Sequence, residues 1–423
     1  MTTSIGVGLI GTGFMGECHA LAFRAAPAVF RTRLGARLEM VADINAGAAR
    51  RAADRFGFAR ATGDWQELVA DPKVDLVAVT SPNLLHKPMA LAALKAGKHV
   101  YCEKPLALTA ADAAEMAAAA AEAGVTTMVG YNYLRSPAVA FAAQLIRDGA
   151  IGRVTYFRGV SDEDYMADPA VPMSWRCRRD QAGSGALGDI GSHILSVALA
   201  LIGPVAEVSA DQRTVIAERP LPAAGEGRER RDGAAAVTAG TAQVENEDQT
   251  HVLLRFADGT IGTVATSRVA WGRKNHLAFE VFGTAGALLF DQERMNELQL
   301  FQPGAVPGDR NGFRTVLTGP AHPHYGAFSP AAGHGLGFND LKVIEVAQLL
   351  DAIAGGPAAY PDFAAAAALE RVSEAIGRSA AERRWVGVGE NSQPLARPDS
   401  LSEPLSSAHI GSAPRGKRRE VTE

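Results

Sequence analysis

The sequence predicts an α/β domain with a parallel sheet, followed by an α+β domain with a large, mainly antiparallel open sheet. Up to about residue 129, short apolar runs alternate with helical patterns, which is typical of a parallel sheet covered on both faces. Beyond residue 130, paired apolar runs flank glycine turns, which indicates antiparallel hairpins. We therefore expect two domains, 1–129 and 130–390, and a disordered Ser/Pro-rich tail over 391–423.

In the first domain, each expected strand is a short apolar run and each expected helix has a helical pattern. Strands are expected over 5–10, 38–42, 74–80, 99–102 and 125–129, and helices over 17–26, 45–56, 88–95 and 109–123. The last helix opens with Thr109 and Asp112 in the spacing of a capping box and closes at Gly124.

In the second domain, a strand is expected over 152–160 and a helix over 188–202, with hairpins formed by 251–256 with 260–267 and by 276–282 with 287–290. Two stretches are expected to be irregular. Residues 219–248 are rich in Ala, Gly and charge and indicate a mobile insertion. Residues 303–337 form a long loop region, and loops of that length are often functional.

Size and composition exclude several classes of protein. The 423 residues suit two domains, and a formal net charge of −4 gives no electrostatic reason to bind nucleic acid. We expect a cytoplasmic protein with no membrane partner, because no apolar run is long enough to span a bilayer and the start lacks the basic residues of a signal peptide. The three cysteines (Cys18, Cys102 and Cys177) are far apart and odd in number, which predicts reduced thiols.

A glycine-rich run after the first strand predicts a dinucleotide site. It matches G-x-G-x-x-G over Gly11, Thr12, Gly13, Phe14, Met15 and Gly16, between an expected strand and an expected helix. Gly11 permits a tight turn, Gly13 lets the backbone approach a pyrophosphate, and Gly16 lets helix and strand pack closely. The helix N-terminus offers N–H groups to the phosphates. The first domain is therefore predicted to be a Rossmann domain, the alternative being a purely structural glycine turn.

Asp43, at the end of the second expected strand, favours NAD over NADP. Its carboxylate suits the two hydroxyls of the adenosine ribose and would repel a 2′-phosphate. Arg50 and Arg51 on the following helix keep NADP open as an alternative, and a simple turn carboxylate at Asp43 is another.

Two later segments carry residues suited to proton and hydride chemistry. Lys104, within Glu103-Lys104-Pro105, follows the fourth expected strand, and ligands bind beyond the carboxyl ends of parallel strands. An ammonium there suits stabilising negative charge on a substrate oxygen. Asp189 and His193 are four residues apart and share a helix face. A neutral His193 suits accepting a hydroxyl proton, and Asp189 suits holding the substrate or tuning the histidine. Each also fits a structural role when taken alone.

Together these motifs resemble the Gfo/Idh/MocA oxidoreductases over about residues 5–388, because they occur in that family's order along with Ser81-Pro82-Asn83, His86 and Gly130-Tyr131-Asn132-Tyr133. The resemblance implies that Lys104, Asp189 and His193 form a catalytic triad and that the Lys104–Pro105 peptide bond is cis. It implies a cofactor site that also includes Ser81, Asn83, His86, Glu103, Lys104 and Arg176. It further implies a homo-oligomer, a dimer or tetramer, formed through the antiparallel sheet.

Segments 174–176, 182–189 and 312–323 are most similar to family members that oxidise C3 of levoglucosan, a bicyclic anhydro-sugar, or of glucosides. A polyol requires several fixed polar groups, and we expect them from Lys104, Asn132, Tyr133, Arg135, Trp175, Asp189, His193 and His324. Trp175 suits either a sugar face or core packing. No metal is expected, because no carboxylate or thiol cluster accompanies His322, His324 and His334.

The sequence thus predicts an NAD-dependent dehydrogenase that oxidises a secondary hydroxyl of a cyclic sugar or polyol. It leaves open whether Lys104 or His193 is the base. The alternatives are a myo- or scyllo-inositol dehydrogenase, a glycoside hydrolase that recycles bound NAD, and a non-catalytic NAD-binding regulator. A regulator has no need of Lys104, Asp189 and His193 together.

Overall fold

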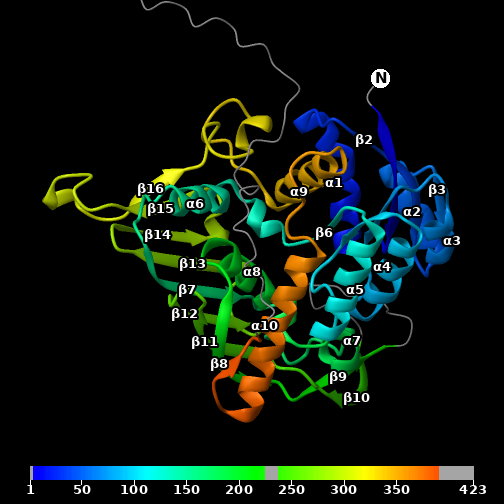
Figure 1. The fold of residues 1–423 in the computed structure, drawn as a ribbon. Coiled ribbons are helices and arrows are strands. Elements are labelled where there is room, and N and C mark those ends of the chain that lie inside the picture. Colours follow the sequence, from blue (N-terminus) through cyan, green and yellow to red (C-terminus); the bar gives the residue numbers. More distant parts are fainter. Residues whose placement is uncertain (1–2, 224–236, 390–423) are drawn as a thin grey trace, which may run out of the picture.

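A computed structural model describes residues 3–223 and 237–389 of the protein. Its N-terminal part is a six-stranded parallel sheet in the order β3-β2-β1-β4-β5-β6 (Figure 1). The strands are β1 (Ser4–Ile10), β2 (Gly35–Ala42), β3 (Arg60–Thr62), β4 (Leu76–Val79), β5 (His99–Cys102) and β6 (Thr127–Val129). Central strands such as β4 are buried along their whole length, because helices cover both faces of the sheet. The predicted parallel sheet is confirmed.

The helices of this part are α1 (Phe14–Phe30), α2 (Ala46–Phe56), α3 (Trp65–Ala70), α4 (His86–Lys95) and α5 (Ala110–Ala123). Their ends follow local chemistry. Thr109 caps α5 through its hydroxyl, which accepts from the Asp112 N–H at 3.1 Å, and Gly124 ends the helix with a φ of 62°. Both ends agree with the prediction. Helix α1 is longer than the helix expected over 17–26, because it starts at Phe14 and continues through Pro27 to Phe30.

The second part is built on a nine-stranded sheet in the order β16-β15-β14-β13-β7-β12-β11-β8-β17. Its bounds are β7 (Val154–Asp162), β8 (Val205–Arg213), β11 (Gln249–Phe256), β12 (Ile261–Ser267), β13 (His276–Gly283), β14 (Gly286–Asp291), β15 (Glu297–Phe301), β16 (Arg314–Leu317) and β17 (Val386–Gly387). β7 and β12 pair in parallel, and the other neighbours in this described sheet are antiparallel. The predicted mainly antiparallel sheet is confirmed.

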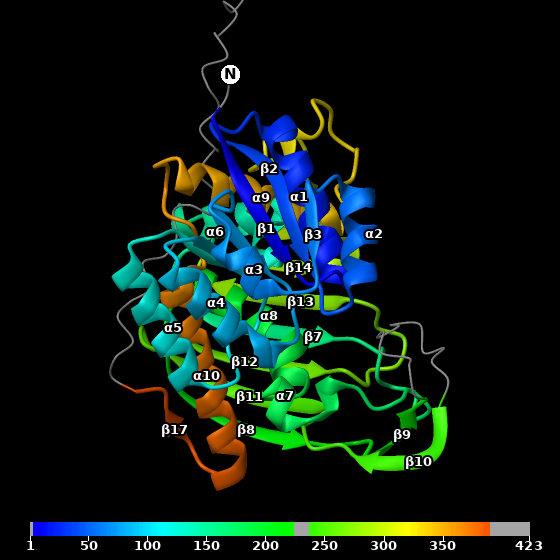
Figure 2. The ribbon, with the colours of Figure 1, turned by 90° about the vertical axis from the view of Figure 1, so that its right-hand side faces the viewer.

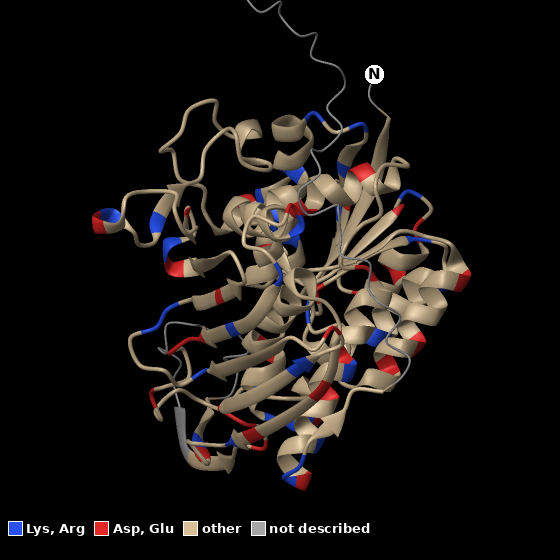
Figure 3. Ribbon diagram, turned by 60° about the vertical axis from the view of Figure 1, so that its left-hand side comes forward, with Lys and Arg blue, Asp and Glu red and all other residues tan. Residues whose placement is uncertain are grey.

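Helices cover one face of this sheet and leave the other open (Figures 1 and 3). The helices of the second part are α6 (Pro137–Arg147), α7 (Arg179–Ala182), α8 (Ser192–Leu201), α9 (Phe338–Ile353) and α10 (Phe363–Glu382). β11 alternates buried and exposed residues, as expected for a sheet packed on one face only. Among the described residues, the run Arg179–Leu201 is long and apolar enough to cross a membrane, but most of it is buried inside the protein, as in a core helix.

Helix α9 joins the two parts because it packs against α1 of the N-terminal sheet. Val346 and Leu350 of α9 share a buried core with Phe23 and Ala26 of α1. The chain therefore returns to the N-terminal part after β16, before it adds β17 to the second sheet. The domain boundary predicted at residue 129 stays a prediction.

The insertion expected over 219–248 is ordered where the structure describes it. β9 (Glu218–Pro222) and β10 (Val237–Gln243) form a two-stranded ribbon beside the end of the large sheet (Figure 2). The expectation of a wholly mobile insertion is wrong, because Leu221 packs on a small apolar core that includes Val244 and Arg219 is fully buried. Residues 224–236 and the tail expected over 391–423 lie outside the described residues. The loop region 303–337 contains β16 and two short 3-10 turns.

Candidate active site

The glycine turn between β1 and α1 has the shape required to hold a pyrophosphate. Gly11 has a φ of +99°, and a Cβ on Gly16 would lie 2.1 Å from the Gly11 carbonyl oxygen, so both positions require glycine. A Cβ on Gly13 would meet nothing within 4 Å, which leaves the backbone open to a ligand. Among the described residues, no side chain caps α1 at Gly13. The first N–H groups of the helix therefore suit an anion.

Asp43 accepts three hydrogen bonds, two of which tie it to this turn. Its Oδ2 accepts from the Thr12 N–H at 3.0 Å and from the Thr12 hydroxyl at 2.6 Å, and its Oδ1 accepts from the Asn45 N–H at 2.9 Å. Phe14, half-exposed at the start of α1, stacks on Phe338 of α9 at 5.9 Å between ring centroids, next to the half-buried Met15. These residues fit a dinucleotide whose adenosine ribose faces Asp43.

Lys104 and Asp189 meet at the carboxyl edge of the parallel sheet. Lys104 follows β5, its peptide bond to Pro105 is cis, and its Nζ lies 3.1 Å from Asp189 Oδ1. Asp189 lies in a π-helical turn, η4 (Leu187–Gly191), and His193 follows in the first turn of α8. The regular helix expected over 188–202 is therefore interrupted at Asp189, and π-turns of this kind are frequent at functional sites.

His193 is buried beside the lysine and is held by aromatic rings. The rings of Tyr131 and Tyr133 approach it edge-on, with centroids 5.8 Å and 4.6 Å away. Its Nδ1 has no hydrogen-bond partner among the described residues. Burial, and then the positive charge of Lys104, holds the pKa of His193 well below its ordinary value. The imidazole is therefore neutral at pH 7 and able to accept a proton.

The second oxygen of Asp189 is held by residues that precede α7. Asp189 Oδ2 accepts from Arg176 Nε at 3.1 Å and from the Tyr165 hydroxyl. The Arg176 guanidinium lies over the Trp175 ring, 4.3 Å from its centroid. Arg176 was expected at the cofactor, and the structure pairs it with Asp189. Sequence analysis missed Tyr165, which lies in an irregular stretch that contains no motif.

Glu103 lies behind Lys104 in a buried charge network. Its Oε1 accepts from His19 Nε2 at 2.8 Å and from Lys342 Nζ at 2.9 Å, and its Oε2 accepts from the Lys104 backbone N–H at 3.2 Å. Burial alone would raise the pKa of Glu103, but Lys342 and His19 hold it well below its ordinary value. The carboxylate expected at the cofactor is thus engaged within the protein. Lys342 was not predicted from the sequence. The pattern that could have indicated it is the pair Lys342 and Glu345, which stands inside an otherwise apolar run of α9.

The loop after β4 is tied to the Lys–Pro segment. His86 is buried, with Nδ1 2.8 Å from the Pro105 carbonyl oxygen and Nε2 2.9 Å from that of Ser81. Asn83 donates from Nδ2 to the Ala182 carbonyl at 3.1 Å, which links the first part of the chain to α7. In this structure, therefore, the side chains of His86 and Asn83 bind backbone carbonyl groups of the segments that surround the site.

The remaining expected substrate residues are divided between the site and the interior. Tyr133 packs against His193 and donates from its hydroxyl to Asn275 Oδ1 at 3.0 Å. Asn132 is buried, and its Nδ2 has no partner within the described part of the chain.

Arg135 and His324 lie elsewhere in the structure. Arg135 is fully buried and donates to the Tyr360 carbonyl, a position that argues against direct contact with a sugar. His324 lies with its Nε2 3.3 Å from Nε2 of Gln348, and Gln348 is about 9 Å further along α9 than Lys342. Within residues 3–223 and 237–389, no group of three or more His, Cys, Asp or Glu side chains is arranged to hold a metal ion.

A parallel sheet with an open glycine turn, and a Lys–Asp–His cluster at its carboxyl edge, define a dinucleotide-dependent oxidoreductase. Comparison with protein families agrees. Residues 5–131 match an oxidoreductase family with an NAD-binding Rossmann fold, and residues 139–289 match the GFO/IDH/MocA C-terminal domain. The chain belongs to the Gfo/Idh/MocA family of NAD-binding oxidoreductases, which confirms the resemblance seen in its motifs.

Several relatives are similar over most of the chain. Levoglucosan dehydrogenase of Pseudarthrobacter phenanthrenivorans is 42% identical over 91% of this chain and 98% of its own length. A levoglucosan dehydrogenase structure in complex with NADH and levoglucosan has a TM-score of 0.85 at 40% identity and covers 92% of this chain and 100% of that one. An NAD binding oxidoreductase from Klebsiella pneumoniae has the same TM-score and coverage at 43% identity. The myo-inositol 2-dehydrogenase of Thermotoga maritima is 28% identical over 72% of this chain and 80% of its own.

Proposed function

We propose that this oxidoreductase removes hydride from C3 of a pyranose ring, with levoglucosan or a glucoside as the substrate. The observation that carries the proposal is the contact between Lys104 Nζ and Asp189 Oδ1 at 3.1 Å, next to a buried His193. The similarity to levoglucosan dehydrogenase supports the choice of sugar.

The residues of the chain divide the work as follows. When NAD is bound at the glycine turn, it would supply the hydride acceptor. His193 accepts the proton of the reacting hydroxyl, because its pKa is held well below its ordinary value by burial and then by Lys104. The Lys104 ammonium stabilises the negative charge that develops on the same oxygen. Asp189 holds Lys104 in place and accepts hydrogen bonds from the sugar.

The test is NADH formation at 340 nm with levoglucosan, glucose, glucosides, myo-inositol and scyllo-inositol, each with NAD⁺ and with NADP⁺. We expect a strong rate with one pyranose and NAD⁺. Lys104→Ala and His193→Asn should each lower kcat by about 10²–10⁴-fold and leave NAD binding intact. Full turnover in both variants would refute the assignment. A rate with an inositol alone would move the substrate to the cyclitols, and release of free sugar without net NADH would indicate a hydrolase.

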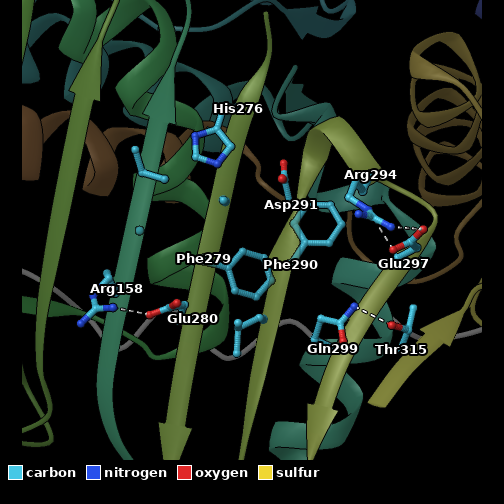
Figure 4. A pocket seen from close by; sticks show the side chains of 14 residues that line it. Arg158, His276, Phe279, Glu280, Phe290, Asp291, Arg294, Glu297, Gln299 and Thr315 are labelled. Carbon is cyan, nitrogen blue, oxygen red and sulfur yellow. Dashed lines mark hydrogen bonds and ion pairs between the residues drawn. The ribbon is translucent and has the colours of Figure 1, made fainter. Parts of the chain in front are cut away.

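We also propose that the protein is a cytoplasmic homo-oligomer, a dimer or tetramer, which associates through the open face of the large sheet. A hollow of about 510 Å³ lies on that face between β7, β13, β14 and β15. It is lined by charged pairs such as Arg158–Glu280 at 2.6 Å and Arg294–Glu297 at 3.0 Å, whereas the side chains of Phe279 and Phe290 are buried in the core beneath it (Figure 4). Polar and charged side chains of this kind are found in the rim of protein interfaces, which supports association through this face. A monomer in light scattering would refute the oligomer, and activity confined to a membrane or secreted fraction would refute the location.

A further inference from the structure

The carboxylate of Asp189 is held from two sides. Oδ1 faces Lys104 at the end of β5, whereas Oδ2 faces Tyr165 and Arg176. Tyr165 and Arg176 both belong to one segment, residues 163–178, which connects β7 to the start of α7 and which we call the arm. Because the two oxygens have different partners, the carboxylate plane cannot rotate without breaking contacts on both sides.

The arm has little regular structure of its own, and Arg219 of the β9–β10 ribbon holds its first half. The Arg219 side chain is fully buried. Its guanidinium donates to the carbonyls of Met166, Asp168 at 3.0 Å and Val171 at 3.3 Å. A buried guanidinium that satisfies three backbone carbonyls is costly to displace. The residues that immediately follow Tyr165 are therefore fixed by the ribbon.

A second buried cation holds the other end of the arm. Arg268 and Asp248 form an ion pair at 2.8 Å in which both side chains are fully buried. Arg268 also donates to the Arg176 carbonyl at 3.2 Å, and Asn246 donates to the same carbonyl at 3.1 Å. Apolar packing completes the anchor, since Met166, Met173 and Cys177 of the arm form a small core with Val244. The arm thus presents Tyr165 to Asp189 from a rigid support.

We propose that Tyr165 is a positioning residue for hydride transfer, which orients the Asp189 carboxylate so that Oδ1 faces Lys104. The inference rests on the proposed function, because that function places Asp189 in the reaction. Burial, and then the charge of Asp189, raises the pKa of Tyr165 well above its ordinary value, so the hydroxyl stays a donor throughout the working pH range.

The test is a double-mutant cycle with Tyr165→Phe and Asp189→Asn, read as kcat and KM for the sugar and as NADH affinity. Tyr165→Phe removes a hydrogen bond to a charged group, so kcat should fall about 10- to 100-fold with NADH affinity unchanged. In the Asp189→Asn background, the same change should cost less than about twofold, because the carboxylate that it orients is gone. Tyr156→Phe is the matched control, since that hydroxyl bonds Thr263 on the large sheet at 3.0 Å, and it should leave kcat unchanged.

Each outcome decides the inference. Tyr165→Phe with wild-type kcat, or with the same loss in both backgrounds, overturns the role of Tyr165 while the proposed function stands. A loss of NADH affinity in place of kcat overturns it as well. Asp189→Asn with full activity, or a wild type inactive with every sugar, overturns the proposed function and this inference together.

Discussion

Replacing Lys342 with methionine tests whether the buried charge network supports the fold. Lys342 is fully buried in α9, and its Nζ lies 2.9 Å from Glu103 Oε1, 2.8 Å from Glu345 Oε2 and 3.1 Å from the Tyr101 hydroxyl. Methionine has a similar length but no charge, so two carboxylates would stay buried without their shared cation. Removing one partner of a buried ion pair costs about 3–5 kcal/mol of unfolding free energy. We expect a loss of that size at pH 7.5.

The loss should also depend on pH. Burial raises the pKa of Glu103, and Lys342 contributes most to lowering it. In the wild type, the low pKa of Glu103 contributes stability above its unfolded value near 4.5, and that contribution is lost as the pH falls through the folded pKa. Without Lys342, burial raises the pKa of Glu103. Acidification then protonates Glu103 and relieves the cost of burying its charge. The difference between variant and wild type should therefore shrink from pH 7.5 to pH 5.

The assay is urea unfolding followed by circular dichroism at both pH values. Lys274→Met is the matched control, because Lys274 pairs with Asp164 at 2.6 Å but its side chain is 76% exposed, and exposed pairs contribute little. Equal unfolding midpoints for wild type and Lys342→Met, or equal losses for the two lysine variants, would refute the reasoning. A difference that grows on acidification would refute the assignment of the penalty to Glu103.

The remaining predictions concern the cofactor and the histidines. Gly13→Val should fold normally, since a Cβ there meets nothing within 4 Å, but lower NADH affinity at least about tenfold in a fluorescence titration. Gly16→Ala should lower the melting temperature, since its Cβ would lie 2.1 Å from a backbone carbonyl oxygen, and a wild-type melting curve would contradict this. Asp43→Ser should raise the NADP/NAD ratio of kcat/KM by roughly tenfold, and an unchanged ratio would remove the role of Asp43. Burial is the largest cause that lowers the pKa values of His19 and His193, so each takes up a proton on unfolding below pH 6.5. Stability should fall by up to about 1.4 kcal/mol per pH unit for each of them from pH 6.5 downward, and urea midpoints that do not change between pH 6.5 and 5.5 would refute this.

Many strands and helices in the first half of the chain could be predicted because the patterns that indicate them are local. The alternation of apolar runs with helical patterns, the glycine turn from Gly11 to Gly16 and the cap at Thr109 depend on neighbours within a few residues. Helix α1 passed its predicted end at residue 26 because it packs along α9, which offsets what Pro27 costs a helix. The short elements β3 and α3 were missed because three and six residues are too few to show a period.

The sequence by itself determined the fold class, the cofactor turn and the order of Lys104, Asp189 and His193, since strand rhythm and motif spacing are properties of nearby residues. Tertiary structure alone decided that Tyr165 holds Asp189, that Arg219 is buried under the arm, and that Glu103 meets Lys342 239 residues away. In the sequence, these charged and polar side chains look like solvated ones. They become buried and structural only when distant segments supply the carbonyls and opposite charges that compensate their desolvation.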